Sequence, residues 1–258
     1  MNTSAVPGFA QLQAPATWRT VDFISDLHLQ ASEPATFDAW RRYMQATPAD
    51  AVFILGDLFE VWVGDDVLAL PGLEADCAVV MHAASQRLGL YFMHGNRDFL
   101  AGDGLMDATG ATLLQDPTVL VLHGQRFVLT HGDALCLDDH DYMAFRAQVR
   151  TPSWQQGFLA QPLAQRQAVA RGLREASESR KRSNASDYAD VDTPAARAWL
   201  AKAQAGTMIH GHTHKPAAHD LGGGMQRVVL SDWDAAAQPA RLEVLRLDSG
   251  GLHRLALG

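Results

Sequence analysis

A run of apolar residues that ends in glycine and aspartate constrains this chain more than any other feature. Residues 52–55 are Val-Phe-Ile-Leu, and Gly56 and Asp57 follow them. Such a run predicts a strand buried on both faces of a parallel sheet, and the glycine lets the backbone turn sharply after it. Asp57 would then lie at the carboxyl end of the strand, where α/β sheets bind their ligands. A single Gly-Asp pair more often only begins a loop. The prediction of a site therefore depends on whether other predicted strands also end in ligand-type side chains.

Two other predicted strands end in pairs of candidate metal ligands. Asp26 and His28 follow the first predicted strand of the chain, and His212 and His214 follow the strand over residues 207–210. Alternate residues of an extended segment point to the same side, so each pair can converge on one ion.

Single candidate ligands follow two further strands. Asn96 comes after the third predicted strand, and His131 comes after a predicted hairpin over residues 119–130. Next to Asn96, Arg97 carries a guanidinium fork that suits a phosphate bound at an ion. We expect Asp98 to fix Asn96 or Arg97 without binding a metal ion itself.

Together these side chains exceed what one tetrahedral zinc site binds. Imidazole and oxygen ligands without thiolates favour manganese, iron or zinc over magnesium alone. Two ions that share Asp57 would use the whole set, and such a pair polarises a phosphoryl group and activates a shared water. The predicted ligands are Asp26, His28, Asp57, Asn96, His131, His212 and His214.

Composition predicts one acidic α/β domain. The 258 residues are 47% hydrophobic, which suffices for one sizeable core, and a formal net charge of −8 argues against nucleic acid as a partner. Cys77 and Cys136 have neither disulfide nor zinc-ribbon spacing, as expected in a reducing cytosol. No signal-peptide pattern or membrane-spanning apolar run occurs, so we expect a soluble or peripheral protein.

The domain organisation follows from shifts in composition. We expect residues 1–18 to form a flexible N-terminal extension and residues 19–258 to form one folded domain. Within it, residues 140–205 have helical patterns and place an apolar group beside a basic one. A solvated helix face is the ordinary explanation, and a lid over an anionic amphiphile is the alternative that we favour. The predicted helices are residues 142–149, 154–182 and 194–205, and residues 226–230 and 241–257 are predicted strands of a second sheet.

The motifs, in this order, resemble those of the calcineurin-like metallophosphoesterases. They are Asp-Leu-His at 26–28, Gly-Asp at 56–57, Gly-Asn-Arg-Asp at 95–98, His-Gly-Asp at 131–133 and Gly-His-Thr-His at 211–214. The resemblance implies an α/β fold, a four-layer α/β/β/α sandwich with a helical lid insertion, and two Mn²⁺ ions per chain.

Longer stretches around these motifs resemble the branch of the family that hydrolyses UDP-2,3-diacylglucosamine in lipid A biosynthesis. That resemblance implies cleavage of the diphosphate to UMP and 2,3-diacylglucosamine 1-phosphate. It also implies a peripheral protein on the cytoplasmic face of the bacterial inner membrane, monomeric and without a nucleic-acid partner.

The same resemblance implies roles for individual residues. One ion would be held by Asp26, His28, Asp57 and His214, and the other by Asp57, Asn96, His131 and His212. The catalytic residues would be Asp57, Asn96, Arg97 and His131. Those that bind substrate would be Asn96, Arg97, Asp139, Ser177, Lys181, Asn184 and His212, with Asn184 at a position where a lysine is common.

The side chain of Arg97 indicates, on physical grounds, which kind of leaving group the reaction has. Many metallophosphoesterases have a histidine after Gly-Asn, and that histidine can protonate an alkoxide leaving group. An arginine stays charged near neutral pH and donates no proton. A phosphate leaving group has a second pKa of about 6 and needs only charge stabilisation. The sequence therefore favours diphosphate over monoester cleavage.

Two other functions remain open from the sequence. A soluble metal-dependent phosphodiesterase or dinucleotide hydrolase would keep its turnover after deletion of residues 154–182. A metal-dependent binding module without catalytic activity would have no turnover for the Asp57→Ala substitution to abolish.

Overall fold

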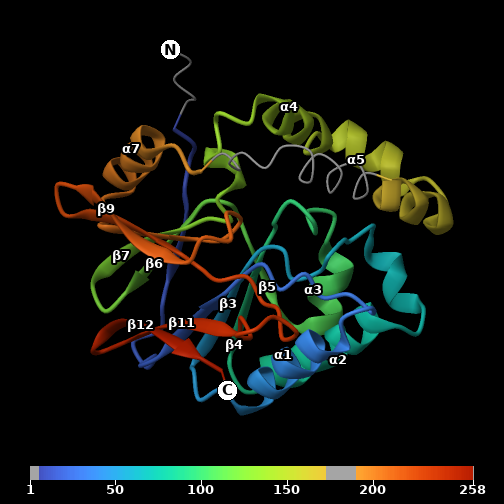
Figure 1. Cartoon of the computed structure of the whole chain (residues 1–258), viewed down its shortest axis with the longest axis horizontal. Helices are drawn as coiled ribbons and strands as arrows, with labels where there is room; N and C mark the ends of the chain where they lie inside the picture. Colours follow the sequence, from blue (N-terminus) through green and yellow to red (C-terminus); the bar gives the residue numbers. More distant parts are fainter. Residues whose placement is uncertain (1–5, 173–189, 258) are drawn as a thin grey trace.

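Two six-stranded sheets stack on one another, and helices cover their outer faces (Figure 1). The structure, a computed structural model, describes residues 6–172 and 190–257. The four layers confirm the predicted α/β/β/α sandwich. Across the described residues, no helix is both long and apolar enough to cross a bilayer.

The first sheet has the strand order β12-β11-β2-β3-β4-β5, and its strands from β2 to β5 run parallel. The predicted Asp57 strand is β3, and it is buried along its whole length. Parallel strands end at the same edge of a sheet, so the loops after β2, β3 and β4 lie together. The strands are β2 (Val21–Ile24), β3 (Ala51–Leu55), β4 (Gly89–Met93), β5 (Thr112–Leu114), β11 (Glu243–Asp248) and β12 (Gly251–Ala256).

The second sheet has the order β1-β6-β7-β8-β10-β9. The predicted hairpin is β6 and β7, with His123 and Gly124 in its turn at positive φ. Strands β7 and β8 run parallel, so the loops that follow them also share an edge. The strands are β1 (Ala10–Gln13), β6 (Thr118–Leu122), β7 (Gln125–Leu129), β8 (Thr207–His210), β9 (Ala217–Gly222) and β10 (Met225–Val229).

Two predictions, one for the C-terminal strands and one for the N-terminal segment, differ from the structure. The strands within residues 241–257 extend the first sheet through β11, which pairs with β2, and do not belong to a second layer. Residues 10–18 do not form the predicted extension, because β1 pairs in parallel with β6 and Trp18 is buried. Residues 1–5 of that prediction lie outside the described residues. The Trp18 ring lies edge-on to the rings of Phe53 and Tyr91 at centroid distances of 6.2 and 5.8 Å. One large aromatic anchors a segment whose composition resembles a disordered tail.

Three apolar clusters account for the layering. One lies between the sheets and includes Phe23, Phe53 and Ile209. A second joins the first sheet to its helices, with Trp40 and Met44 of α1 facing the sheet. A third joins the second sheet to α7 through Trp199. The helices concerned are α1 (Pro34–Ala46), α2 (Leu73–Ser85), α3 (Asp103–Thr109) and α7 (Thr193–Ala203).

The helical insertion begins with α4 (His140–Val149) and α5 (Pro152–Leu159), which lie along one side of the sandwich (Figure 1). The helix predicted over residues 154–182 is interrupted, because α5 ends before Pro162 and a separate helix begins at residue 163 and includes residue 172. Residues 173–182 of the prediction lie outside the described residues. Proline cannot continue a helix but readily starts one. Arg166 is not on a solvated face, because it is buried and pairs with Asp66 at the 3₁₀ helix η1 (Asp65–Ala69).

A buried carboxylate ties strands β2 and β11 of the first sheet to α1. Asp22 of β2 accepts two hydrogen bonds from the Arg246 guanidinium of β11, at 2.7 and 2.8 Å. It also accepts from the hydroxyls of Tyr43 and Thr47, each at 2.8 Å. Both oxygens of Asp22 therefore accept hydrogen bonds, and the Arg246 guanidinium offsets the negative charge.

We predict that Asp22→Ala lowers the free energy of unfolding by about 3 to 5 kcal/mol, because it leaves the partly buried Arg246 charge unpaired. Denaturant unfolding monitored by circular dichroism measures the change. Asp38→Ala is the matched control, since Asp38 pairs with Arg41 on the surface of α1. Such exposed pairs contribute about 0.5 kcal/mol. Equal losses in the two variants would contradict this role of Asp22.

Candidate metal centre

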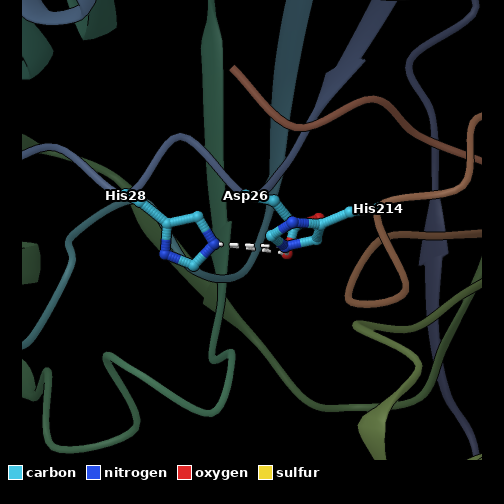
Figure 2. Close-up of side chains that lie close together, drawn as sticks. All are labelled: Asp26, His28 and His214. Carbon is cyan, nitrogen blue, oxygen red and sulfur yellow. Dashed lines mark hydrogen bonds and ion pairs between the residues drawn. The ribbon is translucent and has the colours of Figure 1, made fainter. Parts of the chain in front are cut away.

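Asp26, His28 and His214 point at one another from the ends of two strands (Figure 2). The Nε2 atoms of the two imidazoles are 3.2 Å apart, and His214 Nε2 lies 3.4 Å from Asp26 Oδ1. This Oδ1 atom is buried and accepts no hydrogen bond from a described residue. Buried polar atoms are normally paired, so an unpaired carboxylate oxygen facing two imidazole nitrogens fits a cation.

A second group of candidate ligands adjoins the first. His131 Nε2 lies 3.0 Å from Asn96 Oδ1 and 3.8 Å from Asp57 Oδ1, and His212 Nδ1 lies 2.9 Å from Asn96 Oδ1. The other oxygen of Asp57 lies 3.9 Å from His28 Nε2. Asp57 therefore faces both groups, as a bridging carboxylate would. The structure brings all seven predicted ligands together, and their donor types fit divalent metal.

The paired ligands converge through backbone geometry that differs from the predicted extended conformation. Asp26, His28, His212 and His214 have φ of 55°, 48°, 67° and 52°, and Asp57 has φ of 54°. Residues that carry a Cβ atom rarely adopt this left-handed backbone conformation. Those that do concentrate at functional sites. Only two other non-glycine residues of the described chain have positive φ, so most of this strain lies in the ligand cluster.

Close packing of the backbone explains the glycine next to Asn96. A Cβ atom on Gly95 would overlap the Asp57 carboxylate and backbone nitrogen. Only glycine lets the loop after β4 approach the loop after β3 this closely.

Asp98 holds these two loops together. Its carboxylate accepts hydrogen bonds from the backbone N–H groups of Leu58 and Gly95, each at 2.8 Å, and of Asp57 at 3.3 Å. Asp98 was predicted to fix Asn96 or Arg97, and in the structure its carboxylate binds the backbone of the loop that carries them. Among the described residues, no hydrogen bond joins it to either side chain. Burial and the nearby Asp57 charge raise the pKa of Asp98 to about 6.

Glu60 is a site residue that the sequence reasoning missed. Its carboxylate lies 3.2 Å from His28 Nδ1 and 3.3 Å from the Arg97 guanidinium. It thereby orients a candidate ligand and the arginine at once. A signal was present, since Glu60 is a lone charge in the apolar stretch from Leu58 to Trp62, and a buried charge needs partners.

The imidazoles of the cluster differ in basicity. Burial would lower the pKa of His131, but the charges of Asp57, Asp26 and Asp133 outweigh it and raise that pKa to about 9. Burial and the neighbouring His131 charge lower the pKa of His212 to about 4. His212 is thus neutral at pH 7, as a metal ligand has to be, whereas His131 would have to lose a proton to bind metal.

The remaining predicted residues lie outside this cluster or outside the described residues. Asp139 caps α4, accepting a hydrogen bond from the Tyr142 backbone at 3.0 Å, and its predicted contact with substrate stays a prediction. His210, the last residue of β8, is buried beside Arg227. The predicted substrate contacts Ser177, Lys181 and Asn184 lie outside the described residues.

We predict that Asp98→Asn weakens divalent-metal binding by about 10- to 100-fold, because an amide cannot accept three backbone hydrogen bonds. Isothermal titration of the metal-free protein with Mn²⁺ measures the affinity. The control is Asp103→Asn, an exposed aspartate in the first turn of α3. An Asp98→Asn isotherm that matches the control would show that Asp98 does not hold the ligand loops.

Comparison with known proteins agrees with this geometry. A family model described as calcineurin-like phosphoesterase matches residues 19–216, a range that includes every predicted ligand. UDP-2,3-diacylglucosamine hydrolase of Chromobacterium violaceum is 47% identical over 246 residues, covering 92% of this chain and 99% of that protein. The protein of the same name from Stenotrophomonas maltophilia is 43% identical over 244 residues, covering 90% and 96%. This chain belongs to the calcineurin-like phosphoesterase family.

Proposed function

We propose that this protein hydrolyses the diphosphate of UDP-2,3-diacylglucosamine and releases UMP and 2,3-diacylglucosamine 1-phosphate. Relatives that are 40–47% identical over about nine-tenths of the chain carry the name UDP-2,3-diacylglucosamine hydrolase. The ligand cluster supports a metal-dependent hydrolysis, and two Mn²⁺ ions are the complement that we propose.

The position of Arg97 beside the ligand cluster is the observation that favours a diphosphate as the substrate. Its backbone N–H donates to Asp57 Oδ1 at 2.8 Å, so the residue lies directly beside the ligand cluster. Glu60 holds its guanidinium at 3.3 Å. A fixed guanidinium stabilises negative charge on a departing phosphate but supplies no proton. A leaving group that is itself a phosphate matches this arrangement.

The ligands fall into two sets that share Asp57. Asp26, His28 and His214 would complete one set, and Asn96, His131 and His212 the other. When bound, two divalent ions polarise a phosphoryl group and lower the pKa of a water, which supplies the nucleophile.

The protein orients these ligands through their second polar atoms. His131 Nδ1 lies 2.9 Å from the carbonyl oxygen of Leu55, which directs Nε2 into the site. Glu60 does the same for His28 from the Nδ1 side. Hydrogen bonds of this kind fix the tautomer and the ring plane of a ligating histidine.

The helical insertion supports a peripheral place on the inner membrane, at its cytoplasmic face. Its helices expose the large apolar side chains of Phe145, Leu159 and Val169. Exposed apolar side chains on a helix can enter a lipid interface without spanning it. The acyl chains of the proposed substrate would meet the protein from that side, and a monomer suffices for this arrangement.

We predict that the purified protein with Mn²⁺ and UDP-2,3-diacylglucosamine releases UMP, and that Asp57→Ala abolishes the release. Chromatography of the nucleotide products measures it. Turnover of a simple phosphate monoester or a dinucleotide, without UMP release from the lipid substrate, would overturn the proposed function.

A second prediction tests the contribution of the Arg97 side chain to turnover. Replacing it with alanine removes a charged donor from the developing phosphate and lowers kcat by about 10²- to 10³-fold. Mn²⁺ affinity is expected to stay unchanged, because the guanidinium is not a metal ligand. Arg42→Ala, at an exposed position on α1, is the control. Wild-type kcat in Arg97→Ala would show that another group stabilises the leaving phosphate.

A further inference from the structure

We propose that Arg150, the residue that follows α4 in the helical insertion, is a positioning residue for the metal ion held by Asn96, His131 and His212. The inference rests on the two-ion site proposed above. Arg150 is not one of the ligands, and it acts through contacts with the loops that carry Asn96 and His131.

A stripe of side chains on α4 and its C-terminal cap is directed at one buried carboxylate. Tyr142, Arg146 and Arg150 are spaced by four residues, which places them on one face of the helix. The Tyr142 hydroxyl donates to Asp133 Oδ2 at 2.5 Å, Arg146 donates at 2.8 Å, and the Arg150 guanidinium lies 3.8 Å away. Asp133 comes two residues after His131, so the stripe binds the loop that carries this ligand.

Arg150 also contacts the loop that carries Asn96. Its Nη2 donates to the carbonyl oxygen of Gly95 at 2.7 Å, and its Cζ lies 5.0 Å from the centre of the Phe99 ring. These contacts enclose Asn96 from the two ends of its loop. Gly95 is also the residue whose backbone packs directly against the Asp57 carboxylate.

The two loops come from different sheets, since β4 belongs to the first and β7 to the second. They meet where Asn96 Oδ1 lies 3.0 Å from His131 Nε2 and 2.9 Å from His212 Nδ1. A guanidinium presents several donors in one plane and can span acceptors on two loops, whereas an ammonium group is a single point of charge. Arg150 therefore fixes the separation of the two loops.

The contacts of Arg150 predict selectivity between the two ions. Among the described residues, its hydrogen bond, ion pair and ring contact fall on Gly95, Asp133 and Phe99. The loop from Asp26 to His28 is instead held by backbone bonds to the β3 loop, such as the His28 N–H to Asp57 O bond at 3.0 Å. Loss of Arg150 should weaken the binding of one ion and leave the affinity for the other unchanged.

Mn²⁺ titration calorimetry of the full chain tests this selectivity. For Arg150→Ala we expect one of two binding steps to weaken by about 10- to 100-fold, as for other residues that orient ligands. The other step should keep its wild-type affinity. Arg150→Lys should give an intermediate loss, and the exposed Arg42→Ala none. Two steps that weaken equally, or no change at all, would overturn the proposal.

Hydrogen exchange of the metal-free protein gives a readout that needs neither metal nor substrate. The Gly95 and Arg97 amides belong to the Asn96 loop and donate to the carboxylates of Asp98 and Asp57, at 2.8 Å each. Both should exchange faster in Arg150→Ala. The His28 amide is the internal control and should not change. If Arg150→Ala does not fold, Arg150→Lys replaces it in both experiments.

The two proposals can fail separately. A single Mn²⁺ step in the wild-type protein would contradict the two-ion site, while faster exchange at Gly95 and Arg97 would still support Arg150 as a positioning residue. Unchanged exchange at these amides in the variants would overturn the role of Arg150, whatever the number of ions.

Discussion

Two carboxylates buried next to each other, Asp26 and Asp57, determine much of what surrounds them. One oxygen of each lies, with a His131 nitrogen, in a group whose atoms are all within 4.8 Å of one another. Buried negative charges are costly unless positive charge is close. Without metal, protonated imidazole provides it, which is why the pKa of His131 is raised to about 9. Because metal ligands have to be deprotonated, ions that replace this charge would release protons on binding.

The sandwich supplies these ligands from both of its sheets. Loops after β2, β3 and β4 contribute Asp26, His28, Asp57 and Asn96, and loops after β7 and β8 contribute the remaining three histidines. The site thus lies where the ends of the two sheets meet, and its geometry depends on how the sheets are held together. Asp98 joins neighbouring loops of the first sheet, and Arg150 reaches from the insertion to both sheets. The positions of the candidate metal ligands therefore depend on the packing that joins the two sheets.

Much of the architecture could be predicted because buried parallel strands have continuous apolar sequences. The Val-Phe-Ile-Leu run became β3, and the motifs at strand ends located all seven candidate ligands. Trp18 was missed because a single aromatic anchors β1 within a segment of disorder-like composition. The break at Pro162 was missed because apolar residues continue at helical spacing on both sides of it.

The supporting residues were harder to predict than the ligands. Glu60, Asp98 and Arg150 act through contacts between residues distant in sequence, and the spacing of residues gives no direct sign of them. The left-handed backbone at the ligands was also unexpected, since alternation along a strand predicted the same convergence. Tertiary packing holds that strained conformation, and local propensity does not favour it.

Anomalous diffraction from crystals grown with Mn²⁺ tests the central claim most directly. Two bridged ligand sets predict two anomalous peaks in each chain, one among Asp26, His28 and His214 and the other among Asn96, His131 and His212, with Asp57 between them. A single peak, or a second peak away from Asn96 and His131, would contradict the account of Asp57 as a bridge between two ions.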